Sequence, residues 1–87
     1  MSENARLLYE HATKKRKDLL AENVKSLEAL LTGETRRFEI GESSLFLVNA
    51  REVAVFDSRV TLNDLSAKLQ IAFAKTRFAA GLGFEQN

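Results

Sequence analysis

The sequence predicts an all-α fold, namely a long antiparallel two-helix coiled-coil hairpin. Two observations support this: the 87-residue chain has no proline and only four glycines, and apolar residues recur at seven-residue intervals on both sides of one turn signal. Proline and glycine are common in turns, so a chain poor in both has few places to bend. Seven-residue apolar repeats are typical of helices that pack as coiled coils. We therefore expect a single helical domain over residues 1–87.

The first helix is expected from about Glu3 to about Glu39. Ser2 is a suitable N-cap, and Glu3 lies near the positive end of the helix dipole. The apolar seam of this helix is formed by Leu20, Val24, Leu27, Leu31 and Phe38. A second apolar set lies to one side of the seam and contains Ala5, Leu8, Ala12, Leu19 and Leu30. The apolar face is therefore wide enough to touch more than one neighbour. Gly33 interrupts the pattern and marks either close packing or a local bend.

A turn is expected at about residues 40–44, which read Ile-Gly-Glu-Ser-Ser. Gly41 suits the position just past a helix end, where a left-handed backbone conformation is needed. Ser43 or Ser44 can cap the next helix through its hydroxyl. A short β-hairpin is the alternative, because residues 37–48 contain several β-prone side chains. Helical periodicity on both sides of the turn favours two helices.

The second helix is expected from about Leu45 to about Ala80, followed by a frayed, glycine-containing tail over residues 81–87. Its seam repeats every seven residues at Val48, Val55, Leu62 and Leu69. A separate stripe, more than about 100° away on a helical wheel, contains Val53, Phe56, Val60, Ile71 and Phe78. Two stripes imply neighbours on both sides, as in a sheet of helices rolled into a barrel. The alternative is a helix in the middle of an ordinary bundle.

The composition argues against catalysis. Cysteine is absent and His11 is the only histidine, which excludes thiol chemistry and a histidine-based metal cluster. Ser43 and Ser44 have no base nearby in the sequence, so neither is expected to be a nucleophile. Glu39 and Glu42 flank Gly41 and are best explained as carboxylates that solvate a turn. We therefore expect no enzyme activity, no cofactor and no metal.

The charge and hydropathy patterns also limit the possible partners. The net charge is +1, and the only basic cluster is residues 14–17, too narrow a face for nucleic-acid binding. No stretch approaches the roughly 20 apolar residues that a membrane-spanning helix needs. The first residues have neither the basic nor the apolar region of a signal peptide. Taken alone, the chain is expected to stay in the cytoplasm; taken as a fragment, it would have lost its export signal with its front half.

The turn and its flanks resemble the signature of TolC-family outer-membrane efflux proteins. In that family a helix ends in an aromatic-x-x-Gly step, which Phe38 and Gly41 match. The next helix begins with an apolar stretch that closes in small and polar residues, matched by Val-Asn-Ala-Arg at residues 48–51. The alanine-rich segment ending at Leu82-Gly83 is similar to the last helix of the family. The resemblance covers roughly residues 20–84, which correspond to only the last part of a complete member.

This resemblance implies a hairpin within a TolC-like α-barrel, the periplasmic duct of a three-protomer channel. Gly41, Glu42, Ser43 and Ser44 would form the tip that docks the periplasmic adaptor of an efflux or secretion pump. Asn49 would be a pore-lining residue, neutral where some members carry an acid. The implied location is the outer membrane and periplasm. Membrane contact is expected only through the strands that complete members place in the outer membrane.

Two other functions are compatible with the pattern. A free-standing cytoplasmic coiled-coil module for oligomerisation or adaptor binding would need only the two seams. A small nucleic-acid binder would depend on the basic residues 14–17 alone. The channel hypothesis predicts apolar stripes that stay exposed on two sides of the hairpin, whereas the cytoplasmic module would directly explain the missing signal peptide.

Overall fold

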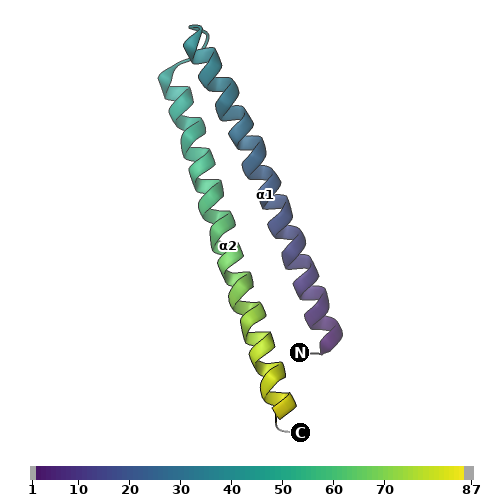
Figure 1. The fold of residues 1–87 in the computed structure, drawn as a ribbon. Coiled ribbons are helices and arrows are strands. Elements are labelled where there is room, and N and C mark those ends of the chain that lie inside the picture. The colour runs from purple at the N-terminus through teal and green to yellow at the C-terminus, as the bar shows by residue number, and fades with distance from the viewer. Residues whose placement is uncertain (1, 86–87) are drawn as a thin grey trace.

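The computed structural model describes residues 2–85, with side-chain surroundings for residues 2–79, and consists of two antiparallel helices. Helix α1 spans Glu3–Glu39 and helix α2 spans Leu45–Glu85 (Figure 1). The predicted all-α hairpin and its turn at residues 40–44 are confirmed. The alternative of a β-hairpin over residues 37–48 is wrong, because this segment is helix, turn and helix.

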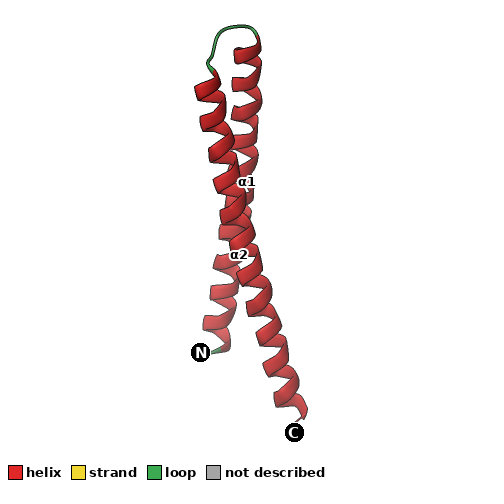
Figure 2. Ribbon diagram, turned by 90° about the vertical axis from the view of Figure 1, so that its left-hand side faces the viewer, coloured by secondary structure: helices red, strands yellow, loops and turns green. Residues whose placement is uncertain are grey.

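The hairpin is long and thin, with principal extents of 70 × 18 × 14 Å. The first turn of α1 and the last turn of α2 lie at the open end, opposite the turn (Figure 1). Seen from the side, the two helices cross and then separate toward the open end (Figure 2). With only one partner helix, each helix leaves most of its circumference uncovered.

Local capping interactions fix both ends of α1. The Ser2 hydroxyl oxygen accepts a hydrogen bond from the backbone N–H of Ala5 at 3.2 Å, as an N-cap does. At the other end, Gly41 has φ 81°, the left-handed conformation expected of it. The N–H of Gly41 donates to the carbonyl of Phe38 at 3.0 Å, and that of Glu42 to the carbonyl of Arg37 at 2.7 Å. This pair of hydrogen bonds is the Schellman motif.

Ser44 caps α2. Its hydroxyl oxygen accepts from the N–H of Leu47 at 3.2 Å, and its carbonyl accepts from the N–H of Val48 at 3.1 Å. Of the two serines that the sequence offered as caps, Ser44 has this role. The hydroxyl of Ser43 therefore has another partner, described below.

Helix α2 was expected to end at about Ala80 and to be followed by a frayed tail over residues 81–87. This boundary is wrong, because the helix continues through Gly81 and Gly83 to Glu85. Glycine within a helix costs only about 1 kcal/mol relative to alanine, which does not by itself stop a helix of this length. Residues 86 and 87 lie outside the described residues.

The predicted seams form the contact between the helices. The buried apolar side chains are Val24, Val48, Val55 and Leu69. Other seam residues, such as Leu27 and Leu62, are half-buried. Phe38, in the last turn of α1, differs from the prediction because it is 41% exposed. The second stripes of both helices remain exposed, as expected for a hairpin that covers one face of each helix.

An ion pair connects the two helices between the turn and the open end. Arg59 of α2 contacts Glu28 of α1 at 3.3 Å, although both side chains are substantially exposed. Gly33, which the sequence analysis connected with close packing or a bend, has no neighbouring atom within 4 Å of the position that a Cβ would occupy. Close packing is therefore not the reason for a glycine there.

Candidate partner-binding site at the turn

The four predicted tip residues lie together in the turn at the closed end of the hairpin. Gly41, Glu42 and Ser44 are exposed, whereas Ser43 is half-buried. The left-handed conformation requires glycine at position 41, and a Cβ added there would meet no atom within 4 Å. The tip is thus an exposed backbone turn tied into α1 on one side and into α2 on the other.

Ser43 points into the hairpin and donates a hydrogen bond to a buried carboxylate. Its hydroxyl lies 2.6 Å from Oε2 of Glu34, a residue of α1 that is only 5% exposed. The Nε of Arg51, on α2, donates to Oε1 of Glu34 at 3.4 Å. A further cation, Nη1 of Arg37, lies 3.9 Å from Oε2. We call these four residues the Glu34 cluster.

The electrostatics of this cluster favour the charged form of the carboxyl group. The hydrogen bond from Ser43 makes the largest contribution to lowering the pKa of Glu34 below its ordinary value of 4.5. Burial opposes this by raising the pKa, while the hydrogen bond from Arg51 and the positive charges of Arg37 and Arg51 lower it further. Glu34 is therefore ionised at neutral pH, and its negative charge is matched by nearby donors.

The burial of Glu34 was not predicted, although the seam contained a signal for it. Leu20 and Leu27 are seven residues apart, and the same interval leads to position 34. A charged residue at a seam position is buried by the facing helix, so its charge needs hydrogen-bonding or oppositely charged partners within the seam. Its partner Ser43 could not be identified from spacing alone, because the turn brings it back toward α1.

A group of large apolar side chains surrounds the turn. We define the tip patch as the exposed apolar residues on either side of it: Phe38, Ile40, Leu45, Phe46 and Leu47. Phe46 is 78% exposed and Ile40 is 69% exposed. Large apolar side chains that stay exposed next to a turn are available for contact with a partner. The patch enlarges the predicted tip from four mainly polar residues to a surface with an apolar component.

Asn49, the predicted pore-lining residue, lies exposed on α2, beyond the tip. It is not part of the Glu34 cluster, and its side chain makes no hydrogen bond to another of the described side chains. The hairpin therefore leaves this amide free for solvent or for a neighbouring chain.

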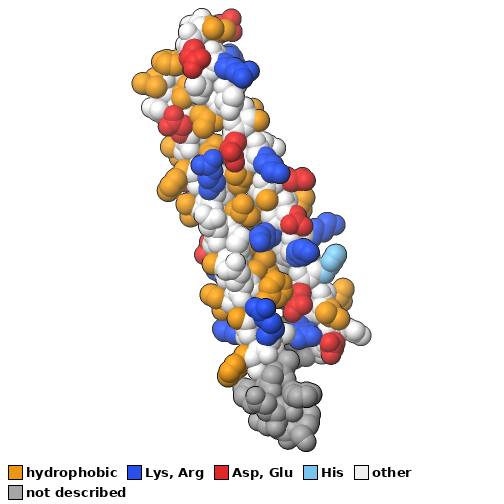
Figure 3. All heavy atoms as spheres, viewed as in Figure 1, with side chains coloured by type: hydrophobic (Ala, Val, Ile, Leu, Met, Phe, Trp, Pro, Cys, Tyr) orange, Lys and Arg blue, Asp and Glu red, His pale blue; other side chains and the backbone are white. Residues whose placement is uncertain are grey.

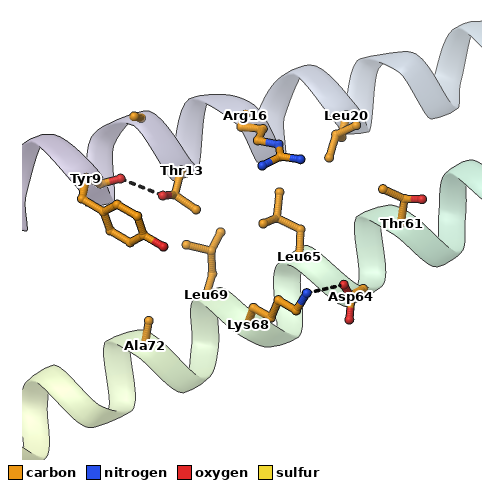
Figure 4. A pocket seen from close by; sticks show the side chains of 11 residues that line it. Tyr9, Thr13, Arg16, Leu20, Thr61, Asp64, Leu65, Lys68, Leu69 and Ala72 are labelled. Atoms are coloured by element: carbon orange, nitrogen blue, oxygen red, sulfur yellow. Dashed lines mark hydrogen bonds and ion pairs between the residues drawn. The ribbon is translucent and has the colours of Figure 1, made fainter.

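A groove lies between the helices toward the open end, where they separate. It has a volume of about 440 Å³ and is lined by Tyr9, Ala12, Thr13, Arg16, Leu20, Thr61, Asp64, Leu65, Lys68, Leu69 and Ala72. Leu65 and Leu69 point from α2 toward α1, and Tyr9 reaches across from α1 (Figure 4). Lys68 pairs with Asp64 at 2.9 Å within α2. The groove is a widening of the apolar seam.

The largest apolar side chains are on the outside of the hairpin. Every phenylalanine whose side chain the structure describes is more than a third exposed: Phe38, Phe46, Phe56, Phe73 and Phe78. Apolar and charged side chains of both signs alternate over the face shown in Figure 3. The buried seam instead uses three valines and one leucine. The hairpin thus leaves its bulkiest apolar groups uncovered.

Among the described residues, no three histidine, cysteine, aspartate or glutamate side chains come together as metal ligands would. Neither helix, over its described length, has an apolar stretch long enough to cross a membrane. Comparisons with protein-family models, with curated proteins and with solved structures found no match.

Proposed function

We propose that this chain is a periplasmic hairpin of a TolC-family outer-membrane efflux or secretion channel. It would contribute to the wall of the helical duct and, with its turn, to the tip that docks an adaptor protein. The observation that carries the proposal is the exposure of large apolar side chains on both helices after the hairpin has formed. A hairpin with such surfaces is expected to stand among further helices.

The shape of the hairpin supports a role as one element of a wall. A rod 70 Å long and less than 20 Å thick can lie side by side with similar rods. On α2, Val53, Phe56 and Val60 are each at least half exposed and lie away from the seam. Their burial against neighbouring helices would supply the free energy of assembly. In this role the protein performs no chemistry, and a partner pump would supply the energy for export.

The tip patch and the turn support a docking role at one end. The turn is capped on both sides and anchored by Ser43, so it presents its exposed groups in a fixed arrangement. A docking partner would meet apolar side chains, the exposed backbone of Gly41 and the carboxylate of Glu42. In the proposed channel, this partner would be the periplasmic adaptor of the pump.

Localisation of the gene product in its source cells provides the first test. An antibody against the hairpin should detect a trimeric outer-membrane protein after cell fractionation. A cytoplasmic antigen that sediments as a well-defined dimer would refute the channel and would instead support a free-standing coiled-coil module.

Site-specific cross-linking provides a second test of the docking role. Because the sequence contains no cysteine, a Glu42→Cys variant of the protein can carry one thiol-reactive cross-linker at the tip. We expect it to capture a periplasmic adaptor, identified by mass spectrometry. Lys15→Cys, exposed on α1 far from the turn, is the matched control and should capture none. Equal capture from both positions would contradict docking at the tip.

A further inference from the structure

Glu34 occupies an unusual place in the hairpin, because a carboxylate stands where the seam calls for an apolar residue. It is the one polar side chain that is buried among those the structure describes. A buried carboxylate is costly unless hydrogen bonds and opposite charges satisfy it. Here Ser43, Arg51 and Arg37 provide both.

These partners come from three different parts of the chain. Arg37 is on α1 with Glu34, Ser43 is in the turn, and Arg51 is in the second turn of α2. The contact with Ser43 is by far the shortest, at 2.6 Å. A hydroxyl that donates to a carboxylate at this distance forms a strong, charge-assisted hydrogen bond. The carboxylate thus connects the turn to both helices.

The other hydrogen bonds of the turn do not make this connection. Gly41 and Glu42 donate backward to carbonyls of α1, whereas Ser44 accepts from the first turn of α2. Each set therefore caps its own helix and leaves the orientation of one cap relative to the other open. Among the contacts of the described residues near the turn, those of Glu34 span the two caps.

We infer that Glu34 is a positioning residue, whose buried carboxylate holds the turn at residues 40–44 in one conformation and so presents the tip to its partner. The second part of this inference rests on the proposed docking function. Glu34 itself is too buried to contact a partner, so its effect on docking must act through Ser43 and the turn.

A merely structural role would predict a different result. Buried ion pairs often add little net stability, and some are better explained by the single conformation that they specify. If Glu34 only stabilised the hairpin, its loss would increase the opening of all amides that exchange through global unfolding. If it positions the turn, the increase should be confined to the turn and the caps beside it.

Amide hydrogen exchange measured by NMR on the full chain separates these results. In Glu34→Ala we expect the protection of the Glu42 and Leu47 amides to fall about tenfold, since a charge-assisted hydrogen bond is lost. Glu34→Gln should give a smaller decrease, because its amide oxygen can still accept from Ser43. Ser43→Ala should reproduce the effect of Glu34→Ala.

The matched control is Glu28→Gln, which also removes a carboxylate that pairs between the helices. Glu28 is 44% exposed and contacts Arg59 far from the turn, so its loss should leave the Glu42 and Leu47 amides unchanged. Equal loss of protection along both helices in Glu34→Ala, or no loss at the turn, would overturn the positioning role.

Cross-linking from Glu42→Cys then tests the consequence for docking. Addition of Glu34→Ala should lower adaptor capture at least severalfold, although position 34 is buried. Unchanged capture in a variant whose turn amides have lost protection would overturn the link between positioning and docking. Failure of the tip to capture an adaptor without the second substitution would refute the proposed function alone, because the exchange data would still establish the positioning of the turn.

Discussion

Replacement of Gly33 or of Gly41 by alanine should change the stability of the hairpin in opposite directions. A Cβ at Gly33 or at Gly41 would meet no atom within 4 Å, so neither substitution creates a clash. The two positions differ in backbone conformation: Gly33 is helical, whereas Gly41 has φ 81°. The comparison therefore isolates the conformational contribution of glycine.

The expected magnitudes follow from that difference. At Gly33, alanine should stabilise the protein by about 1 kcal/mol, the difference in helix propensity between the two residues. At Gly41, the left-handed conformation costs a side chain about 1–2 kcal/mol. Part of this cost is offset because alanine restricts the unfolded chain more than glycine does. We therefore expect Gly41→Ala to destabilise by about 1 kcal/mol.

Urea unfolding followed by far-UV circular dichroism measures both effects. With a denaturant dependence of about 1 kcal/mol per molar urea for a chain of this size, each midpoint should move by roughly 1 M. Each variant must be measured over a range of concentrations, because self-association would stabilise the folded state by mass action. Gly41→Asn should lower the free energy of unfolding less than Gly41→Ala does, since asparagine tolerates the left-handed conformation better than alanine. A neutral or stabilising Gly41→Ala would refute the assignment of the turn.

Three further outcomes follow from the packing, the cap and the carboxylate. Leu69→Ala should lower the unfolding free energy by about 2 kcal/mol, the low end of the usual range, because Leu69 borders the groove; Ile71→Ala, at an exposed position, should change it by less than about 0.5 kcal/mol. Ser44→Ala should lower the unfolding free energy by about 1 kcal/mol, because it removes an N-cap. Urea titration measures the unfolding free energy of these three variants. Because the pKa of Glu34 is lowered on folding, its stabilising effect should be complete above pH 4.5 and disappear as the pH falls through its folded pKa; in Glu34→Gln this part of the acid titration should be missing.

The sequence predicted the hairpin well because its strongest signals are local. Seven-residue spacing identifies helix and contact face together, and Gly41 fixes the turn by a conformational requirement that few other residues meet. Ser2 could be identified as a cap for the same reason. These features need no knowledge of residues far away in the chain.

The features that the sequence did not predict depend on groups that meet only in the folded hairpin. The choice between Ser43 and Ser44 as the cap depends on which hydroxyl the turn directs toward α2. Glu34 is a tolerable seam residue only because Ser43 and Arg51 reach it. The end of α2 was missed for another reason: the cost of each glycine is smaller than the stability of a long helix, so Gly81 alone does not set the boundary.

The distribution of apolar side chains by size indicates that the hairpin packs against further neighbours. A free-standing coiled coil gains most by burying its largest apolar groups in its own seam. This hairpin buries valines and one leucine there and leaves five phenylalanines more than a third exposed. Each phenylalanine can bury roughly 150–250 Å², so covering what these five expose would remove on the order of 500 Å² from water. At about 25 cal/mol per Å² this corresponds to roughly 10 kcal/mol before the costs of association. That driving force favours packing of further helices against this hairpin, which either a channel wall or an oligomerising coiled-coil module would provide.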